Sequence, residues 1–311
     1  IRTVIKPGFD ASLLRLDNGK FLSAKIDGNP KHCYIDPRNG AIGCFEEACR
    51  NVICTGANPI GMVDHLQFGN PEDPEIFWTF MESLQGLTEF AKFLRIPCVG
   101  GKVSFYNETS TGPIKPTPLI GVLGVTDNPL ISTQPSSGDY IVVIGKTNDE
   151  LGGSEYYEYI HKFVGGTCPT VNFKESKINM LSVLSLIKNK LVNSVHDCSK
   201  GGFIIALTEV AIFGKIGCEI DLANLPSNNT RNDEVMLFSE SHSRYLLSID
   251  KKNIAKVKNY LTKKKVPFGI LGRFSGDQIK IKHKSKYISK YQINIAEKKY
   301  FNTLEELLKH G

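Results

Sequence analysis

The sequence has no C-x-x-C pair, although it contains eight cysteines in 311 residues. The ligand spacing that is typical of structural zinc sites is therefore missing. Three of the cysteines, Cys44, Cys49 and Cys54, lie within or beside an apolar helical pattern. We predict that these three are small core residues, as free cysteines often are. Unpaired thiols are typical of a reducing compartment, so we predict a cytoplasmic protein.

Long hydrophobic runs are also missing. No apolar segment approaches the roughly 20 residues that a membrane-spanning helix needs, and the first residues do not have the pattern of a signal peptide. We therefore expect no membrane partner. The sequence starts at Ile1 rather than at a methionine, which leads us to expect a piece of a longer protein.

Neither sign of charge dominates. The net charge is +6, and lysines concentrate at 263–265 and between 280 and 290. Such runs usually form solvated faces, and the stacking aromatics and motifs of nucleic-acid-binding proteins are missing. We therefore expect no nucleic-acid partner. The length predicts two domains, and the turn-rich segment 129–138 is the predicted boundary between them.

The first domain is predicted to begin with strands at 1–10 and 21–26, joined by a hairpin turn at Asn18-Gly19, and to continue with a polar loop at 27–40. A helix follows, because apolar residues recur at helical spacing: Phe45, Ala48, Cys49, Val52 and Ile53. A second helix is predicted to start with Asp73 as N-cap and Pro74 in its first turn. Its predicted buried face consists of Phe77, Phe80, Met81, Leu84, Leu87, Ala91 and Leu94.

Polar residues follow two short apolar stretches of this domain. The stretch 60–63 is predicted to be a short strand that brings Asp64 to its end, and the stretch 96–99 is predicted to be a strand that ends at Gly100-Gly101. A polar cluster comes directly after the glycines: Lys102, Ser104, Tyr106, Asn107, Glu108 and Thr109. Two glycines allow close approach of the backbone to a ligand, and donors around them suit phosphate or a phosphorylated sugar. Such a bend can equally be structural.

Several motifs occur in one order along the chain. They are Y-I-D-P-R-N-G-A-I from Tyr34, F-E-E-A-C-R-N-V-I from Phe45, D-H-L-Q-F-G-N-P from Asp64, G-G-K-V-S-F-Y-N-E-T from Gly100 and H-D-C-S-K-G-G from His196. Over nearly its whole length the chain thereby resembles phosphoribosylformylglycinamidine synthase subunit II. This family is part of the wider aminoimidazole ribotide synthetase superfamily.

The resemblance implies an α+β fold. Residues 1–135 would form an aminoimidazole ribotide synthetase-like N-terminal domain, a mixed sheet with helices, and residues 136–311 an α/β-sandwich C-terminal domain. Members of the family consist of two similar halves, and this sequence resembles the second half alone. The catalytic histidine of the family belongs to the first half. We therefore predict no catalytic residue here and no activity for the chain alone.

The resemblance also implies the reaction. In the family, ATP activates an amide oxygen of formylglycinamide ribonucleotide, and ammonia from a glutaminase subunit displaces phosphate to form the amidine and ADP in de novo purine biosynthesis. The implied cofactors are ATP and Mg²⁺. The implied partners are the first half, the glutaminase subunit and a small bridging subunit. Because half of a pseudo-dimeric fold would expose an apolar surface, we also expect a homodimer of this chain.

Carried over by position, Asp64 and Gly101 would contact ATP, and Ser104 would contact the phosphoribosyl substrate. Lys102 stands where the family has an asparagine that binds magnesium. An ammonium has no lone pair for a metal, so Lys102 would either replace the metal's charge or point to solvent. Together with two further departures from the family pattern, Gln67 and Lys200, it favours a rival hypothesis: a non-catalytic scaffold half.

Structural interpretations remain open for several of these residues. Asp64 and Ser104 could each cap the turn that follows them. His196-Asp197 suggests acid–base chemistry, but its place ahead of a glycine-led helix favours a structural turn. The Glu240-Ser241 pair and Arg244 could bind an anion, but we interpret them as a surface ion pair.

Overall fold

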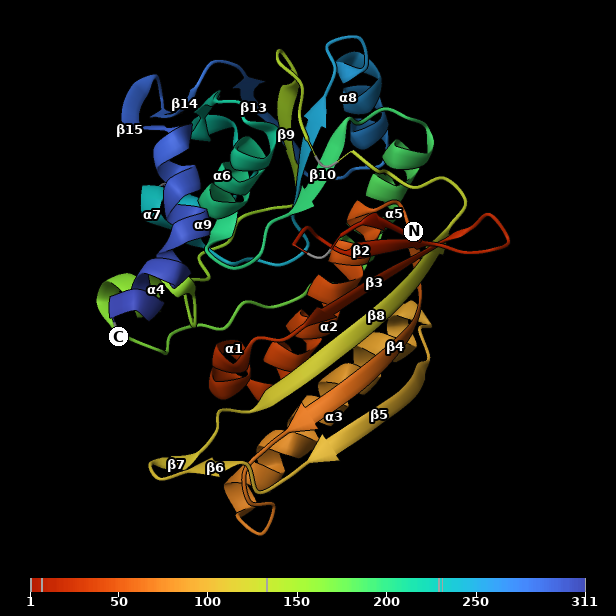
Figure 1. The fold of residues 1–311 in the computed structure, drawn as a ribbon, viewed down its shortest axis with the longest axis vertical. Helices are drawn as coiled ribbons and strands as arrows, with labels where there is room; N and C mark the ends of the chain where they lie inside the picture. The colour runs from red at the N-terminus through yellow and green to blue at the C-terminus, as the bar shows by residue number, and fades with distance from the viewer. Residues whose placement is uncertain (1, 7, 133, 229, 231, 311) are drawn as a thin grey trace.

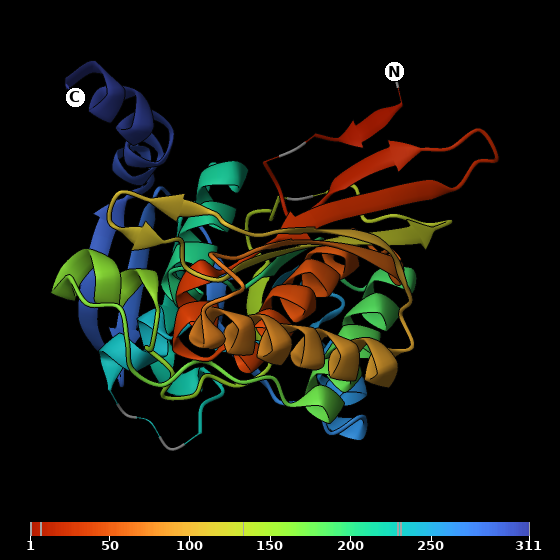
Figure 2. The same ribbon diagram turned by 90° about the horizontal axis from the view of Figure 1, so that it is seen from below.

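The computed structural model of the protein describes residues 2–6, 8–132, 134–228, 230 and 232–310, the His310 side chain excepted. Two sheets form two lobes (Figure 1). Three helices cover one face of the first sheet (Figure 2): α1 (Pro30–Ile35), α2 (Pro37–Cys54) and α3 (Pro74–Leu94). The first sheet has the order β1 (Thr3–Ile5), β2 (Ser12–Arg15), β3 (Phe21–Asp27), β8 (Thr117–Thr126), β4 (Asn58–Gln67) and β5 (Cys98–Ser104).

The second sheet follows a connection at 127–139, and the predicted division between residues 135 and 136 falls within it. Its order is β10 (Ser194–Asp197), β12 (Tyr245–Ile249), β9 (Tyr140–Ile144), β13 (Phe268–Phe274), β11 (Cys218–Asp221), β14 (Gln278–His283) and β15 (Lys286–Gln292). The remaining elements are β6 (Glu108–Thr109), β7 (Gly112–Pro113), α4 (Glu155–His161), α5 (Phe173–Lys188), α6 (Gly202–Gly214), the 3-10 turn η1 (Leu222–Asn224), α7 (Asp233–Phe238), α8 (Ile254–Lys263) and α9 (Ile293–His310). No helix in the described part of the chain is both long and apolar enough to cross a bilayer.

Two predictions for the first domain are wrong. The hairpin partner of β3 is β2, with Ser12 opposite Ala24, rather than a strand over residues 1–10. The predicted loop at 27–40 holds α1 and the first turn of α2. The residues that suggested a loop are helix-starting signals: Asn29 caps α1 ahead of Pro30, and Asp36 caps α2 ahead of Pro37.

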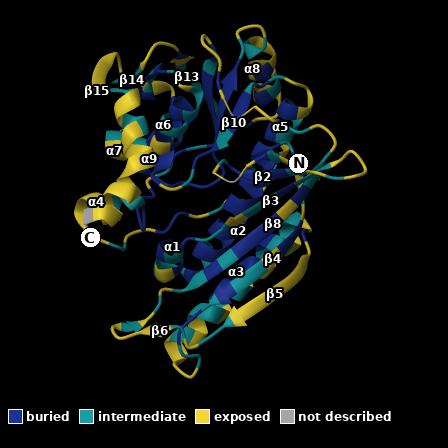
Figure 3. Cartoon of the chain, viewed as in Figure 1, coloured by how far each residue is buried: buried dark blue, intermediate teal, exposed yellow. Residues whose placement is uncertain are grey.

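The helix α2 is the common core element of the two lobes. It packs against α3 and β8 of the first lobe and against α5 and β10 of the second. Cys44, Cys49 and Cys54 are buried, as predicted. One continuous cluster of buried apolar side chains therefore extends from the first sheet through α2 to the second (Figure 3).

The start of α3 is as predicted, because the Asp73 side chain accepts hydrogen bonds from the backbone at its first turn. Its buried face is shifted. Phe77 and Met81 are each 47% exposed, whereas Phe90 is fully buried. The Ser83 hydroxyl lies 3.3 Å from the carbonyl oxygen of Pro37, the first residue of α2. The turns of α3 before Ser83 therefore extend beyond the N-terminal end of α2, and Phe77 and Met81 on these turns stay partly exposed.

Candidate functional site

Asp64 and Gly101 are neighbours across the parallel pair β4 and β5, where they are direct register partners. The expectation that each stands at a strand end is wrong. Asp64 lies inside the ten-residue strand β4, and Gly101 lies in the middle of β5. Strand β5 is the edge of its sheet, so this pair lies beside a free sheet edge.

A side chain at position 101 would collide with the Asp64 carboxylate unless that carboxylate moved. A Cβ atom at 101 would lie 2.2 Å from Asp64 Oδ1, far closer than atoms can approach. Gly100 differs, because a Cβ atom there would meet only Val63 at 3.9 Å. The two adjacent glycines therefore have separate roles, and only Gly101 makes room for the carboxylate.

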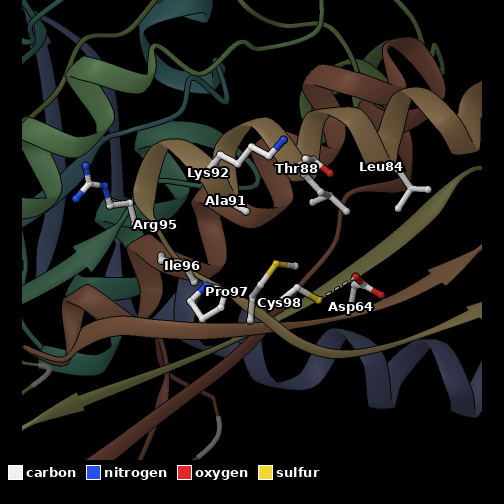
Figure 4. A pocket seen from close by; sticks show the side chains of 11 residues that line it. Asp64, Leu84, Thr88, Ala91, Lys92, Arg95, Ile96, Pro97 and Cys98 are labelled. Carbon is white, nitrogen blue, oxygen red and sulfur yellow. Dashed lines mark hydrogen bonds between the residues drawn. The ribbon is translucent and has the colours of Figure 1, made fainter.

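The Asp64 carboxylate opens into a cavity of about 470 Å³ between α3 and the two strands (Figure 4). Its floor is apolar: Met62, Leu84, Leu87, Ala91, Ile96 and Pro97. Lys92 and Arg95 supply cations, and Thr88 and Cys98 add polar groups. The Cys98 thiol lies 3.6 Å from Asp64 Oδ2, and burial, together with Asp64, raises the pKa of this thiol. The cavity thus offers one acceptor for hydroxyl or amine groups, with Lys92 and Arg95 at its rim and the Arg95 guanidinium pointing away from Asp64 (Figure 4).

The side chains of Lys102 and Ser104 lie on the face of the sheet opposite that of Asp64. Gly101 shares a face with its register partner Asp64, and successive side chains along a strand point to opposite faces. Lys102 is exposed and pairs in register with His65, and Ser104 pairs with Gln67. The structure therefore does not gather the four predicted site residues on one surface. It places Asp64 and Gly101 on one face of the sheet and Lys102 and Ser104 on the other.

Ser104 also takes part in a local turn. The Asn107 amide donates to the carbonyl oxygens of Ser104 and Phe68, at 2.9 Å in both cases. The Ser104 hydroxyl lies 3.3 Å from Asn107 Oδ1. The turn interpretation is thus supported, and a contact with a ligand stays a prediction.

A second polar cluster was missed from the sequence. Asp27 on β3, Asn51 on α2 and Asp197 on β10 lie together: the Asn51 amide is 3.1 Å from Asp27 Oδ2 and 3.4 Å from Asp197 Oδ2. Arg50 donates to Asp197 at 3.1 Å. Burial, and then the charges of Asp27 and Asp197, raise the pKa of Glu47 well above its ordinary value. Burial also raises the pKa of Asp197 to about 6.

The raised pKa values reflect first the burial of these carboxyl groups, which nearby Arg50 offsets only in part. The signal available in the sequence was the E-E-A-C-R-N run within α2, which puts charged residues in a helix that also has an apolar pattern.

The link to the first site is geometric. Asp27, Ile120 and Asp64 form one register row across β3, β8 and β4. The two carboxylates therefore share a face of the sheet, about 10 Å apart.

His196 is not in a turn, which corrects the sequence interpretation. It ends the strand β10 together with Asp197. Its ring nitrogens lie 2.9 Å from Asp10 and 3.1 Å from Glu209. Burial alone would lower the pKa of His196, but the two carboxylates raise it well above the ordinary value. Among the described residues, Asp10, His196 and Asp197 have ligand atoms within 4.8 Å of one another, which is the spacing of a metal site.

The predicted surface ion pair at 240–244 is also wrong, because these residues are buried. Arg244 donates to the carbonyl oxygen of Ser239 at 2.5 Å and to the Thr147 hydroxyl at 2.9 Å. Glu240 accepts from the backbone amides of Gly201 and Glu155, both at 2.8 Å. Burial raises the pKa of Glu240 to about 7. The segment thus ties the starts of α4 and α6 together.

Comparison with known proteins places these features in a family. The N-terminal domain model of AIR synthase related proteins matches residues 8–126, and the C-terminal domain model matches residues 136–284. The chain is 39% identical over 309 residues to phosphoribosylformylglycinamidine synthase subunit PurL of Thermococcus sibiricus, which covers 99% of this chain and 42% of that protein. For the Methanobrevibacter smithii subunit the identity is 40% over 286 residues, with 90% and 40% covered. The chain thus spans less than half the length of these relatives.

Solved structures give the same fold at lower identity. T. maritima PurL complexed with FGAR has a TM-score of 0.81 at 18% identity, covering 94% of this chain and 48% of that one. The ATP complex has a TM-score of 0.78 at 18% identity, with 92% and 46% covered. A structure of PurLQS from T. maritima has a TM-score of 0.75 at 19% identity, with 93% and 46% covered.

Proposed function

Because the chain belongs to the family of AIR synthase related proteins, we propose that it is the second half of an ATP-dependent phosphoribosylformylglycinamidine synthase. This carbon–nitrogen ligase converts formylglycinamide ribonucleotide, ammonia and ATP to the amidine, ADP and phosphate in cytoplasmic purine biosynthesis. The observation that carries the proposal is the identity of 39% over 99% of the chain to a PurL subunit. The fold shared with PurL structures titled as FGAR and ATP complexes supports it.

In this proposal, Asp64 accepts hydrogen bonds from hydroxyl or amine groups of the nucleotide. Gly101 has no side chain and therefore leaves room for this carboxylate. Lys92 and Arg95 stand beside the same cavity and suit the phosphates. Ser104 contacts the phosphoribosyl substrate on the other face. Since β5 is the edge strand, ligands on its two faces are separated only by that strand. No residue of this chain is assigned to proton transfer.

Magnesium fits the acidic cluster better than the position that the family pattern suggests. Lys102 offers an ammonium, which cannot coordinate a cation. Asp27, Glu47 and Asp197 offer carboxylate oxygens, the ligands that Mg²⁺ prefers. These three carboxylates would hold Mg²⁺, with Asn51 beside them, although their ligand atoms would have to draw together, because among the described residues the group already at metal-site spacing is Asp10, His196 and Asp197. A bound Mg²⁺ would neutralise phosphate charge.

The face of the first sheet that lies opposite α1, α2 and α3 supports the proposal that this chain binds a partner. A register row runs from Ile26 through Gly121 to Val63 and Gly100, and Ile26 is 68% exposed. Nearby Val99 is 65% exposed. We propose that this apolar face packs against the corresponding sheet of the first half, or of a second copy when the first half is missing. A glutaminase subunit and a small bridging subunit complete the proposed assembly, and the similarity to a PurLQS structure supports further subunits.

The second candidate function is a non-catalytic scaffold half, and specific residues favour it. Lys102 replaces a metal ligand of the family pattern, and Lys25 and Arg50 already supply cations near the acidic cluster. In that case the chain would only hold the first half and the glutaminase.

Growth complementation tests the proposal and separates the two candidates. A strain that lacks phosphoribosylformylglycinamidine synthase receives the remaining part of the T. sibiricus subunit, with or without this chain. We expect growth without purines only when both are present. Asp64→Ala should abolish this growth if the chain contributes to the active site, whereas a scaffold should tolerate it. Lys290→Ala, on the exposed edge of the second sheet, is the matched control.

A further inference from the structure

Another cavity lies between the two lobes and meets the Asp64 cavity at Arg95 and Ile96, which line both. Its volume of about 360 Å³ is within the range of roughly 300–1,000 Å³ that small-molecule sites occupy. One wall belongs to the first lobe and consists of the start of β4 and the residues at the end of α3. The other wall is α5 of the second lobe. We call this space the interlobe cavity.

The walls of the interlobe cavity are mainly aliphatic. Apolar side chains of both lobes line it, among them Ile53, Ile60, Leu94, Ile96, Met180 and Leu181. Ile60 of the first lobe is 51% exposed, and Leu181 of the second is 54% exposed. Neighbouring apolar side chains that stay uncovered in this way are typical of binding sites.

The charge in this cavity has one sign. Among the described residues that line it, Arg95 and Lys177 are cations and none is acidic. Neither cation forms an ion pair with another described residue. The Lys177 ammonium lies 5.2 Å from the centre of the Phe93 ring, a contact that leaves its charge in place. The Arg95 guanidinium points away from Asp64 (Figure 4). The cavity therefore joins an apolar space to positive charge that no acidic side chain balances.

We propose that the interlobe cavity binds a small amphiphilic anion. Its apolar body lies between β4 and α5, and its carboxylate or phosphate lies against Arg95 and Lys177. Guanidinium and ammonium groups are the usual protein partners of both head groups. Because the two cations belong to different lobes, the bound anion connects the lobes. The proposal does not depend on the nucleotide role given to Asp64.

The Asp64 cavity is the competing place for such a ligand, and its charge disfavours it. It too has an apolar floor, with Lys92 at its rim. The Asp64 carboxylate lines it, however, and repels an anion. The interlobe cavity has no such group among its described lining residues.

Calorimetric titration of the wild-type chain tests the site with four probes that share one alkyl chain: octanoate, octyl phosphate, octylammonium and octanol. We expect the two anions to bind at one site per chain. Both should bind more tightly than octylammonium or octanol, because only an anion is attracted to Arg95 and Lys177.

Variants locate the bound anion. Arg95→Gln and Lys177→Gln should each weaken octanoate binding by about fivefold, as expected for one exposed charge contact, and should leave octanol binding unchanged. Leu181→Glu should also weaken octanoate binding, because it adds an acid beside the cations, and its exposed position tolerates the change. Lys174→Gln is the matched control, exposed and one turn earlier on α5, and should bind octanoate like the wild type.

Lys92→Gln separates the two cavities, because Lys92 lines the Asp64 cavity and not the interlobe cavity. It should bind octanoate like the wild type. The proposal is overturned if neither anion binds saturably, or if octylammonium binds as tightly as octanoate. It is also overturned if Arg95→Gln and Lys177→Gln leave octanoate binding unchanged, or if Lys92→Gln weakens it as much as Lys177→Gln does.

Discussion

The Asp64 carboxylate occupies the space above Gly101 that any side chain at that position would need, with 2.2 Å between Asp64 Oδ1 and an added Cβ atom. The two residues are register partners on parallel strands, although 37 positions separate them in the sequence. The relationship links the two motifs that the sequence singles out. It also explains why the second of two adjacent glycines, and not the first, is tied to the candidate site.

Replacing Gly101 with alanine should therefore displace the Asp64 side chain. We expect Gly101→Ala to weaken ATP binding by the assembled halves and to destabilise the fold by about 1–3 kcal/mol, as overpacking usually does. Gly100→Ala is the matched control on the same strand, because its Cβ atom would make one ordinary contact. Calorimetric titration and urea unfolding measure both effects. Equal behaviour of the two variants would contradict the role given to Gly101.

The acidic cluster should bind Mg²⁺. We expect added Mg²⁺ to raise the melting temperature of the wild-type chain, because a ligand that binds only the folded state stabilises it. Glu47→Gln should remove most of this rise, whereas Glu72→Gln, at an exposed turn, should leave it unchanged. Differential scanning calorimetry with and without Mg²⁺ makes the comparison. A rise of the same size in Glu47→Gln would rule out Glu47 as a ligand.

Lys102 lies on the same face of β5 as Ser104 and therefore stands beside the proposed phosphoribosyl substrate rather than the ATP cavity. Lys102→Ala should weaken the binding of formylglycinamide ribonucleotide with or without Mg²⁺, by on the order of 1 kcal/mol for an exposed phosphate contact. Lys102→Asn should instead make this binding more dependent on Mg²⁺, since an amide oxygen can coordinate the ion. Titration calorimetry on the assembled halves distinguishes the variants. Identical magnesium dependence in wild type and Lys102→Asn would leave Lys102 as a surface residue.

Glu240 should make the fold less stable as the pH rises. Burial raises its pKa from 4.5 to about 7 in the folded state, so the folded chain binds more protons than the unfolded chain between these values. The stabilisation is complete below pH 4.5 and is lost as the pH rises through 7. We expect Glu240→Gln to remove this pH-dependent loss of unfolding free energy, which is on the order of 3 kcal/mol in the wild type. Urea unfolding of the wild type and of Glu240→Gln between pH 4.5 and 8 measures the effect. If the unfolding free energies of the two proteins change with pH in parallel, the account is contradicted.

Local patterns predicted elements whose signals are contained within a few residues. The start of α3 at Asp73 and Pro74 is one such case, and the buried cysteines of α2 are another. The region 27–40 shows the limit. Asparagine, aspartate and proline favour both turns and first helical turns, and only packing against the rest of α2 decides between the two.

The site could be predicted only in part, because it depends on pairings that no local pattern contains. Asp64 and Gly101 were identified, but not their direct contact across β4 and β5. Asp197 reaches Asn51 across 146 positions of sequence, and Arg244 is buried through contacts with a distant loop. Charged residues are usually exposed, so the sequence alone favours a surface ion pair at Arg244. Long-range packing decides otherwise.

The most direct test of the central claim is a turnover assay with purified components. Formylglycinamide ribonucleotide, ATP, Mg²⁺ and ammonium are supplied to this chain alone, to the remaining part of the T. sibiricus subunit alone, and to both together, and ADP release is measured. The account predicts no turnover by either part and turnover by the mixture, which Asp64→Ala abolishes. Turnover by this chain alone, or a mixture that binds together but stays inactive, would contradict it.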